Sequence, residues 1–486
     1  MAQTTEPADR AGGVTQRAVL IALVVLVLLT PLAFYLEFVW DKATVFAGIP
    51  SMTPVVLLLL LTAAMGLPLL RRIGLGRREL LTIYSVVLVA GPLVSTGILG
   101  FMLVKSIHYH YFASVYRDWQ NTFIPQVPLW FAPTDPAVVE AFFLGESPVP
   151  WAQWWGPLGA WSAFTLAVFV CAFCVIALLQ RQWITHERLS FPFAQVPLEL
   201  VREAGAGPPS RPVLPRAWLF WGGLLISFAL TAVGQVSKHV PAVPPINLGP
   251  LILMQESKVG PIAGMGQFVL WLLPWTIAVA YLIPKDLSFS AWFFYWALVG
   301  VTMIGIALGG DPGPVADNWW TTFPAPKWQG GGAIFAFGLW SLWIARHHLA
   351  RAFRGLLPGR APADDAQEPL SHRAAIVGLL ISSIGLVYFC WAAGCRLWFS
   401  LALIGGIVGY HVMWARLRAE TGLGFLIFPL QLQFIPRIPF GTAAYRVREW
   451  VTTISARWAY TPGGGSSFDV CTGNALETFK IADSAQ

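Results

Sequence analysis

The chain has 486 residues, of which 56% are hydrophobic and only 11% charged, and its formal net charge is +7. Soluble domains carry about 25% charged residues, so this composition excludes an ordinary soluble protein and predicts a membrane protein with many spans. The basic residues are spread over short loops between apolar segments, which argues against nucleic acid as a partner and leaves membrane lipid as the expected surroundings. The 37 prolines are many for plain spanning helices, so proline-broken or re-entrant segments are expected.

The apolar segments predict an all-α, polytopic transmembrane helix bundle of about ten spans. The first apolar run is too long for a signal-peptide core and is interpreted as a retained span. A further run at 425–435 is too short to cross and is expected to be interfacial or re-entrant. The predicted spans are 18–36, 54–70, 80–104, 157–179, 217–236, 268–284, 288–308, 331–345, 374–394 and 396–414.

Lysine and arginine alternate strongly between the two sides of these spans. The N-terminal tail and every second loop hold 17 basic residues, and the opposite loops hold 7. Because basic loops stay inside, this predicts a membrane protein with a cytoplasmic N-terminus. The predicted parts are a cytoplasmic tail (1–17), a first bundle of about eight spans (18–345), a cytoplasmic linker (346–373), a second set of membrane segments (374–436) and a cytoplasmic C-terminal tail (437–486).

The motifs that are missing narrow the function. The sequence has neither a phosphate-binding G-x-x-x-x-G-K-[ST] loop nor an H-E-x-x-H pair, which disfavours ATP-driven transport and zinc proteolysis. No cofactor or metal is expected. Cys171 and Cys174 form a C-x-x-C inside an apolar run and are interpreted as packing residues. His411 is near the interior of a span and is a candidate proton relay or a packed histidine.

The segment RQWITHERLSFPFAQVPLELVRE (181–203) is amphipathic and contains two prolines. Glu187 and Arg188 are either interfacial anchors or a gate on the cytoplasmic face, where a carboxylate entering a cavity could carry a proton. The phrase ERLSFPFA is echoed by KDLSFSAW at 285–292, and repeated elements mark many secondary transporters. In the second turn, Asp286 is a candidate site residue or a helix cap.

The stretch ARLRAETGLGF (415–425) is the densest charge cluster near the end of a span. Arg416 and Glu420 share a helix face, with Arg418 between them in sequence. The glycines that follow end the helix and allow backbone to approach a ligand. These residues therefore form either a helix stop on the basic side or a site for a carboxylate or phosphate on a solute.

Two resemblances add to these patterns. AGIPSMTPVVLLLLLTAAMGLPLLRRIGLGRRELLTIYSVVLVAG (47–91) and ERLSFPFAQVPLELV (187–201) are similar to segments of the oligopeptide transporter family, although Phe193 and Ala194 stand where that family has Ser-Gly. The residues that match its early turn and basic loop are Gly48, Pro50, Ser51, Arg77, Arg78 and Glu79. RQWITHERLSFPFAQVPLEL, YLIPKDLSFSAWFFYW and RLRAETGLG resemble an uncharacterised family of bacterial polytopic membrane proteins, whose members often continue beyond a segment like 474–486. A truncated form or a second membrane subunit is therefore expected, or a homo-oligomer.

The resemblance implies a secondary transporter of a small organic or peptide-like solute, working by alternating access, with proton coupling left open. The alternative is a membrane-embedded transferase-type enzyme, or an accessory subunit, that acts on a lipid-linked substrate. In that case Glu37, Asp41 and the aromatic outer loop 105–156 would carry the site. The same loop could instead be an interfacial lid that rests on the bilayer through its tryptophans.

Overall fold

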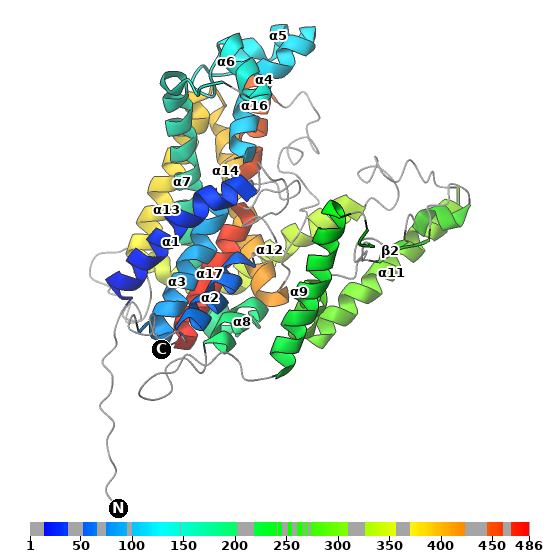
Figure 1. Cartoon of the computed structure of the whole chain (residues 1–486). Helices are drawn as coiled ribbons and strands as arrows, with labels where there is room; N and C mark the ends of the chain where they lie inside the picture. Colours follow the sequence, from blue (N-terminus) through cyan, green and yellow to red (C-terminus); the bar gives the residue numbers. More distant parts are fainter. Residues whose placement is uncertain are drawn as a thin grey trace, which may run out of the picture.

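The structure is a computed structural model of the whole chain, shown in Figure 1. It describes residues 14–36, 52–65, 74–94, 100–145, 147–201, 218–240, 242–244, 251–254, 260–265, 268–270, 274–309, 326–355, 370–422, 445–459 and 468–485.

Helices dominate the described residues, as the sequence predicts. One short antiparallel hairpin, β1 (Leu251–Met254) with β2 (Phe268–Leu270), was not part of the all-α prediction. The α-helices are α1 (Gln16–Phe34), α2 (Thr53–Ala64), α3 (Arg77–Ala90), α4 (Phe101–Val115), α5 (Arg117–Thr122), α6 (Pro136–Leu144), α7 (Trp151–Arg181), α8 (Pro192–Leu200), α9 (Trp218–His239), α10 (Pro274–Leu282), α11 (Lys285–Ala307), α12 (Pro326–Arg354), α13 (His372–Ala392), α14 (Leu397–Thr421), α16 (Val447–Ser455) and α17 (Phe468–Ala485).

Five helices in the described part of the chain are long and apolar enough to cross a membrane: α1, α7 with the turn that follows it, α11, α13 and α14. Side-chain caps define where two of them begin, because Thr15 accepts a hydrogen bond from the Ala18 amide and Ser371 accepts one from the Ala374 amide. These five helices make the chain a candidate multi-pass membrane protein. By helix length and composition, the described residues hold five candidate spans, compared with the ten that the sequence predicts.

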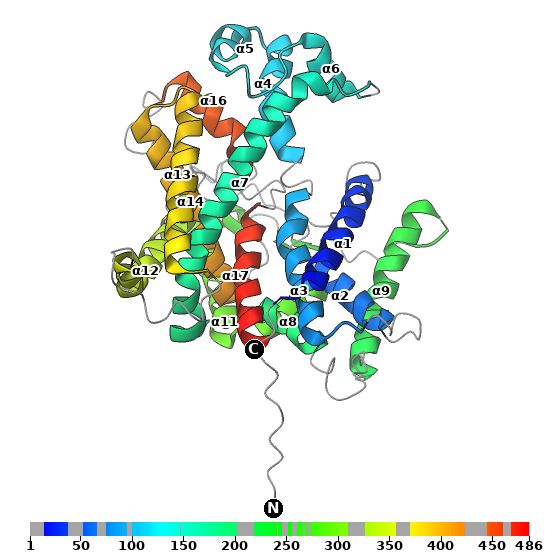
Figure 2. The same ribbon diagram turned by 90° about the vertical axis from the view of Figure 1, so that its left-hand side faces the viewer.

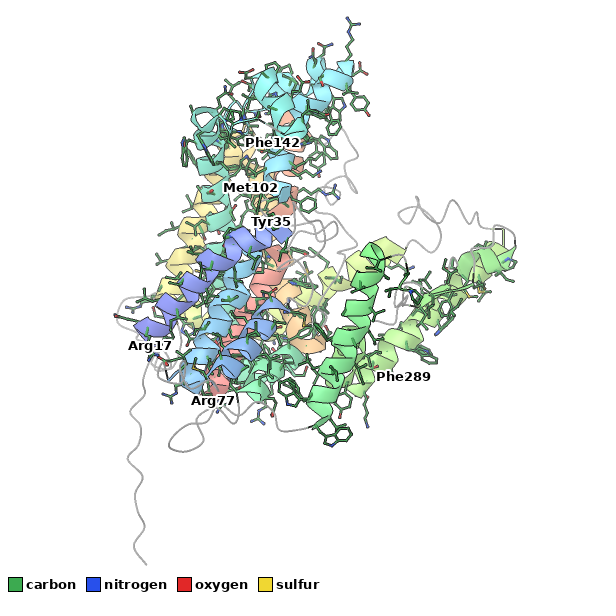
Figure 3. All side chains as sticks on the ribbon, in the orientation of Figure 1. Arg17, Tyr35, Arg77, Met102, Phe142 and Phe289 are labelled. Atoms are coloured by element: carbon green, nitrogen blue, oxygen red, sulfur yellow. The ribbon has the colours of Figure 1, made fainter. Side chains whose placement is uncertain are left out.

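The main bundle has two distinct ends. Figures 1 and 2 both place α5 and α6 at one end, beyond the start of α7, and the end of α17 at the other. The first end is built from the predicted outer loop 105–156, which is folded into α4, α5 and α6 and packs Trp154 with Phe142. Figure 3 labels Phe142 at this end of the bundle. We refer to it as the outer cap.

Two chain segments run the length of the bundle, each as two helices separated by a 3-10 turn and by residues outside the described part (95–99 and 460–467), and we call them the broken helices. In the first, α3 is followed by a 3-10 turn, η3 (Gly91–Val94), and then by α4. In the second, α16 is followed by a 3-10 turn, η11 (Arg457–Ala459), and then by α17. The two lie side by side, with α17 against α3 and η3, and with α16 and η11 against α4 (Figure 2).

The C-terminal part of the chain therefore packs inside the bundle. The sequence predicts a cytoplasmic tail over 437–486, but Val451, Trp458, Leu476 and Ile481 are all buried core residues. α17 mixes apolar residues with Asn474, Glu477 and Lys480, so it lacks the long apolar stretch that identifies a span in a sequence. Tertiary partners for those polar groups allow it to be buried.

Helices α9 and α11 stand beside the main bundle in Figure 1, and Phe268 of the hairpin packs against Trp296 near the middle of α11. Their side chains, including Phe289 in Figure 3, are largely exposed, and only 6% of the most apolar window of α11 is buried. Helix α12 lies across the bundle, since it runs sideways in Figure 1 and is seen end-on in Figure 2. The predicted span 331–345 falls in α12.

Two hydrophobic clusters hold the bundle together. The one nearer the outer cap joins α4, α7, α13, α14 and α16 around Trp161, Phe164 and Trp458. The one at the opposite end joins α1, α2, α3, α7, α8, α14 and α17 around Trp183 and Leu476. Helices α7 and α14 contribute to both clusters and so connect the two ends.

Candidate functional site

The proline-rich segment after α7 folds back onto the end of α14. α7 ends in a π-helical turn, Gln182–His186, and the chain then reverses through Arg188 and Phe191, whose φ angles are 52° and 43°. Positive φ angles are unfavourable for residues with a side chain, so the surrounding contacts must hold them. The Phe191 amide donates a hydrogen bond of 2.9 Å to the carbonyl oxygen of Ala419. The Ser190 hydroxyl donates one of 2.8 Å to the carbonyl oxygen of Glu420.

Gly422 is the point where this segment, α14 and Ile283, just after α10, meet. Its φ of +64° ends α14, and a Cβ there would lie 2.8 Å from Pro192 Cγ and 3.4 Å from Ile283 Cγ2. Only glycine fits both this φ angle and this space. The predicted glycine stop is therefore confirmed at Gly422, and it brings the neighbourhoods of both echoed turns together.

Arg416 is the centre of a charge network on this inner end of α14. Its guanidinium pairs with Glu187, Nη1 to Oε2, at 2.5 Å and with Glu420, Nε to Oε2, at 3.2 Å. The arginine side chain is only 3% exposed. Three aromatic rings surround it, with its Cζ 5.7 to 5.9 Å from the ring centroids of Trp183, Phe337 and Trp340.

This network joins the folded-back segment to two helices at once. Glu187 is held by its helix, because Gln182 donates a 3.0 Å hydrogen bond to its second carboxylate oxygen. Arg416 also contacts the Ser341 hydroxyl on α12 at 3.5 Å. Removing one partner from a buried pair leaves the other charge uncompensated, which is strongly destabilising. We call the contacts among Glu187, Arg416 and Glu420 the latch.

Arg418 points to another side of α14 and belongs to a second ion pair. Residues that are two apart on a helix, such as Arg416 and Arg418, face different directions. Arg418 pairs with Glu477 of α17 through Nε–Oε1 at 2.6 Å and Nη2–Oε2 at 3.2 Å. Both side chains are buried, at 1% and 4% exposed. The Cζ of Arg418 lies 5.3 Å from the ring centroid of Phe193. A Cβ on Gly473 would lie 2.4 Å from Arg418 Cδ, so that glycine makes room for the arginine.

The carbonyl oxygen of Leu88, near the end of α3, accepts its hydrogen bond from the second broken helix. In a continuous helix the Leu88 carbonyl would accept from the amide four residues later, but that residue is Pro92, which has no N–H. The Asn474 amide of α17 takes its place, with Nδ2 donating to the Leu88 oxygen at 2.6 Å. The amide orientation is fixed by this contact, because a flipped amide would set two oxygens against each other.

The structure separates the predicted site residues into groups. Glu187, Arg416 and Glu420 come together in the latch, and Arg418 lies apart with Glu477. Arg188 is exposed at its positive φ, and Asp286 is exposed in the first turn of α11. Both lie outside these two charge groups. Glu37 and Asp41 fall outside the described residues, as does the predicted 425–435 segment.

Glu477, Asn474 and Glu449 are polar residues that the sequence reading did not select. Glu449 of α16 is fully buried and bonds to Arg396 at the outer end of α14, Nε–Oε1 at 2.8 Å and Nη2–Oε2 at 2.6 Å. The three lie in weakly apolar helices that resemble a solvated tail. The signal was the i, i+3 spacing of Asn474 and Glu477, which places both on one side of α17.

Three histidines approach one another where α7, α12 and α13 meet on the latch side. The ring centroid of His348 lies 6.3 Å from that of His186 and 5.9 Å from that of His372. Burial lowers the pKa of His348, a hydrogen bond to the Leu178 carbonyl opposes this, and nearby His372 and Arg351 lower it further. The imidazole of His348 is therefore neutral near pH 7.

Within the described residues, no group of three His, Cys, Asp or Glu side chains is placed to hold a metal ion. Cys171 and Cys174 are free and buried, in keeping with packing residues. Buried His411 lies 3.1 Å from the Ala459 carbonyl oxygen, which joins α14 to the second broken helix.

The long apolar helices mark a candidate multi-pass membrane protein, and its bundle holds buried ion pairs. Residues 8–486 match DUF6785, a family of unknown function, and the chain belongs to that family. No curated protein matches the chain. No solved structure matches it either.

Proposed function

We propose that this protein is a secondary transporter of a small organic solute, working by alternating access in a bacterial inner membrane. The observation that supports this most is the pair of broken helices packed side by side. Secondary transporters bind their solutes where discontinuous helices meet inside the membrane, and irregular backbone is stable there only when protein or water satisfies it. The Asn474–Leu88 bond is such a contact between the two broken helices.

The end of the bundle that holds the latch is proposed to face the cytoplasm. Figure 3 places Arg17 and Arg77 at that end, far from Phe142 in the outer cap. Basic residues accumulate on the cytoplasmic side of membrane proteins. In this orientation the segment 181–201 covers the cytoplasmic entrance, between α14 and the broken helices.

The latch then acts as the cytoplasmic gate. Its closed form is held by the Arg416–Glu187 pair and by the two hydrogen bonds from Phe191 and Ser190 to the end of α14. Opening separates Glu187 from Arg416, and the backbone at Arg188 and Phe191 relaxes from its positive φ angles. The strained backbone angles lower the free energy needed to open the latch, and the Arg416–Glu187 pair raises it. A few contacts therefore set the equilibrium between the closed and the open form.

The first test is accessibility of the latch. Single cysteines are placed through 183–201 and 412–422 in a cysteine-free version and labelled with a membrane-impermeant reagent from each side. Glu187→Gln removes one charge from the latch, and hydrogen bonds to charged groups contribute about 1.5–3 kcal/mol. The open population should therefore rise about 10- to 100-fold, and a cysteine at buried Val412 should become labelled from the cytoplasmic side.

The matched control is Glu140→Gln, which removes an exposed carboxylate in the outer cap. It should leave the labelling pattern unchanged. The companion measurement is uptake of a mixed pool of labelled solutes into proteoliposomes, read by mass spectrometry. Equal labelling of Val412→Cys with and without Glu187→Gln, together with unchanged uptake, would remove the gate from the proposal.

A further inference from the structure

Arg418 is buried and has hydrogen-bonding capacity left over. Two of its guanidinium nitrogens are occupied by Glu477, but the third, Nη1, is buried and has no hydrogen-bond partner among the described residues. Nη1 carries two N–H donors that can only be satisfied by an acceptor. A buried charged donor without an acceptor is destabilising, and such orphaned groups are rare in native proteins.

A second orphaned donor lies one helical turn away. The indole Nε1 of Trp414 is also buried without a partner, and Trp414 and Arg418 are four residues apart on α14, on the same side of the helix. Two donors, one of them charged, are the arrangement that binds a carboxylate. The third orphan is an acceptor, the Oδ1 of Asn474, which is buried and whose amide nitrogen is already used by Leu88.

These groups belong to α14 and α17, two helices that pack against each other. Gly473, next to Asn474, lies directly against the Arg418 side chain, since a Cβ there would be 3.2 Å from Arg418 Nε. Asn474 and Glu477 are on one side of α17, and Tyr84 of α3 lies within electrostatic range of both Arg418 and Glu477. The site is thus beside the break between α3 and α4, where Asn474 also bonds to Leu88.

We infer that Arg418, Trp414 and Asn474 form a buried binding site for a small carboxylate that carries its own hydrogen-bond donor, and that Glu477 occupies the arginine while the site is empty. The solute carboxylate accepts from Arg418 Nη1 and Trp414 Nε1, and its N–H or O–H group donates to Asn474 Oδ1. Glu477 neutralises the same guanidinium through its other nitrogens, so its negative charge opposes the binding of a second carboxylate. This inference names the class of solute. The role of the site in transport rests on the proposed function, whereas its ability to bind a carboxylate does not.

The test measures binding to the purified full chain in detergent, which needs no transport. Thermal stability is recorded with L-lactate, L-alanine and dialanine, which have a carboxylate and a donor. Propionate lacks the donor, and alaninamide lacks the carboxylate. A ligand that binds only the folded state raises the unfolding temperature in proportion to its affinity. At least one of the first three probes should stabilise the protein, and the last two should do so at least about tenfold more weakly.

Variants separate a binding site from a purely structural ion pair. Glu477→Gln removes the competing carboxylate and should tighten binding about tenfold, whereas Trp414→Phe removes one donor and should weaken it about fivefold. The matched control is Glu449→Gln, which alters the bidentate pair of buried Glu449 with Arg396 and should leave affinity unchanged. If Glu477→Gln does not fold, the Trp414→Phe effect decides.

The inference is overturned if none of the three probes stabilises the wild type or any folded variant. It is also overturned if Glu477→Gln and Glu449→Gln change affinity equally, because the pair would then be structural. Carboxylate binding without uptake would keep the site and refute the transporter. Uptake without carboxylate binding would keep the transporter and refute the carboxylate site.

Discussion

Replacing Asn474 with leucine, a residue of similar volume, tests the contact that joins the two broken helices. The Leu88 carbonyl then loses its 2.6 Å donor inside a protein core. A buried carbonyl left unpaired destabilises by about 1–3 kcal/mol, and deleting the orphaned Oδ1 of the same side chain recovers about 1 kcal/mol. The expected net loss in the free energy of unfolding is therefore about 1 kcal/mol.

A second substitution isolates that hydrogen bond. Pro92→Ala supplies a backbone N–H at the position that a continuous helix would use for Leu88. In the Pro92→Ala background, Asn474→Leu should be less harmful by about 1 kcal/mol, which is the coupling energy of a double-mutant cycle. Reversible unfolding by SDS in mixed micelles, followed by circular dichroism, gives the four free energies. A coupling energy within about 0.3 kcal/mol of zero would refute the reasoning that Asn474 replaces the missing amide.

Two further predictions follow from the same end of the bundle. Gly422→Ala forces a side chain onto a φ of +64° and against the ring of Pro192, so we expect a loss of about 2 kcal/mol in the free energy of unfolding, measured by the same assay. The control is Gly405→Ala, which should be neutral because a Cβ there meets nothing within 4 Å. Equal effects at both glycines would contradict the docking of 181–201 on α14. The pKa of His348 is lowered in the folded state, so its contribution to stability is full above the ordinary histidine pKa of about 6.5 and is lost as pH falls below it. Wild-type protein should lose more stability between about pH 7 and 5.5 than His348→Gln, with exposed His347→Gln behaving like the wild type; parallel pH profiles for all three proteins would show that His348 is not the titrating group.

The charge network was partly predictable. The spacing of Arg416 and Glu420 placed them on one helix face, and the structure confirms that contact at 3.2 Å. Glu187 was selected for its charge beside two prolines, but its pairing with Arg416, more than two hundred residues away, depends on how α7 ends and reverses. Glu477 was not selected, because an acidic residue near the end of a polar helix gives no local sign of burial.

Composition alone predicted a helical membrane protein, because apolar content and segment length depend only on the residues themselves, and five long apolar helices agree with that prediction. The helix stop at Gly422 and the caps at Thr15 and Ser371 were likewise local, since each acts within a turn of its own position. Only the tertiary structure decided that the predicted tail is part of the core. A helix with asparagine and glutamate can be buried when partners such as Leu88 and Arg418 come from elsewhere in the chain. Those partners lie between 59 and 386 residues away, and no local pattern carries that information.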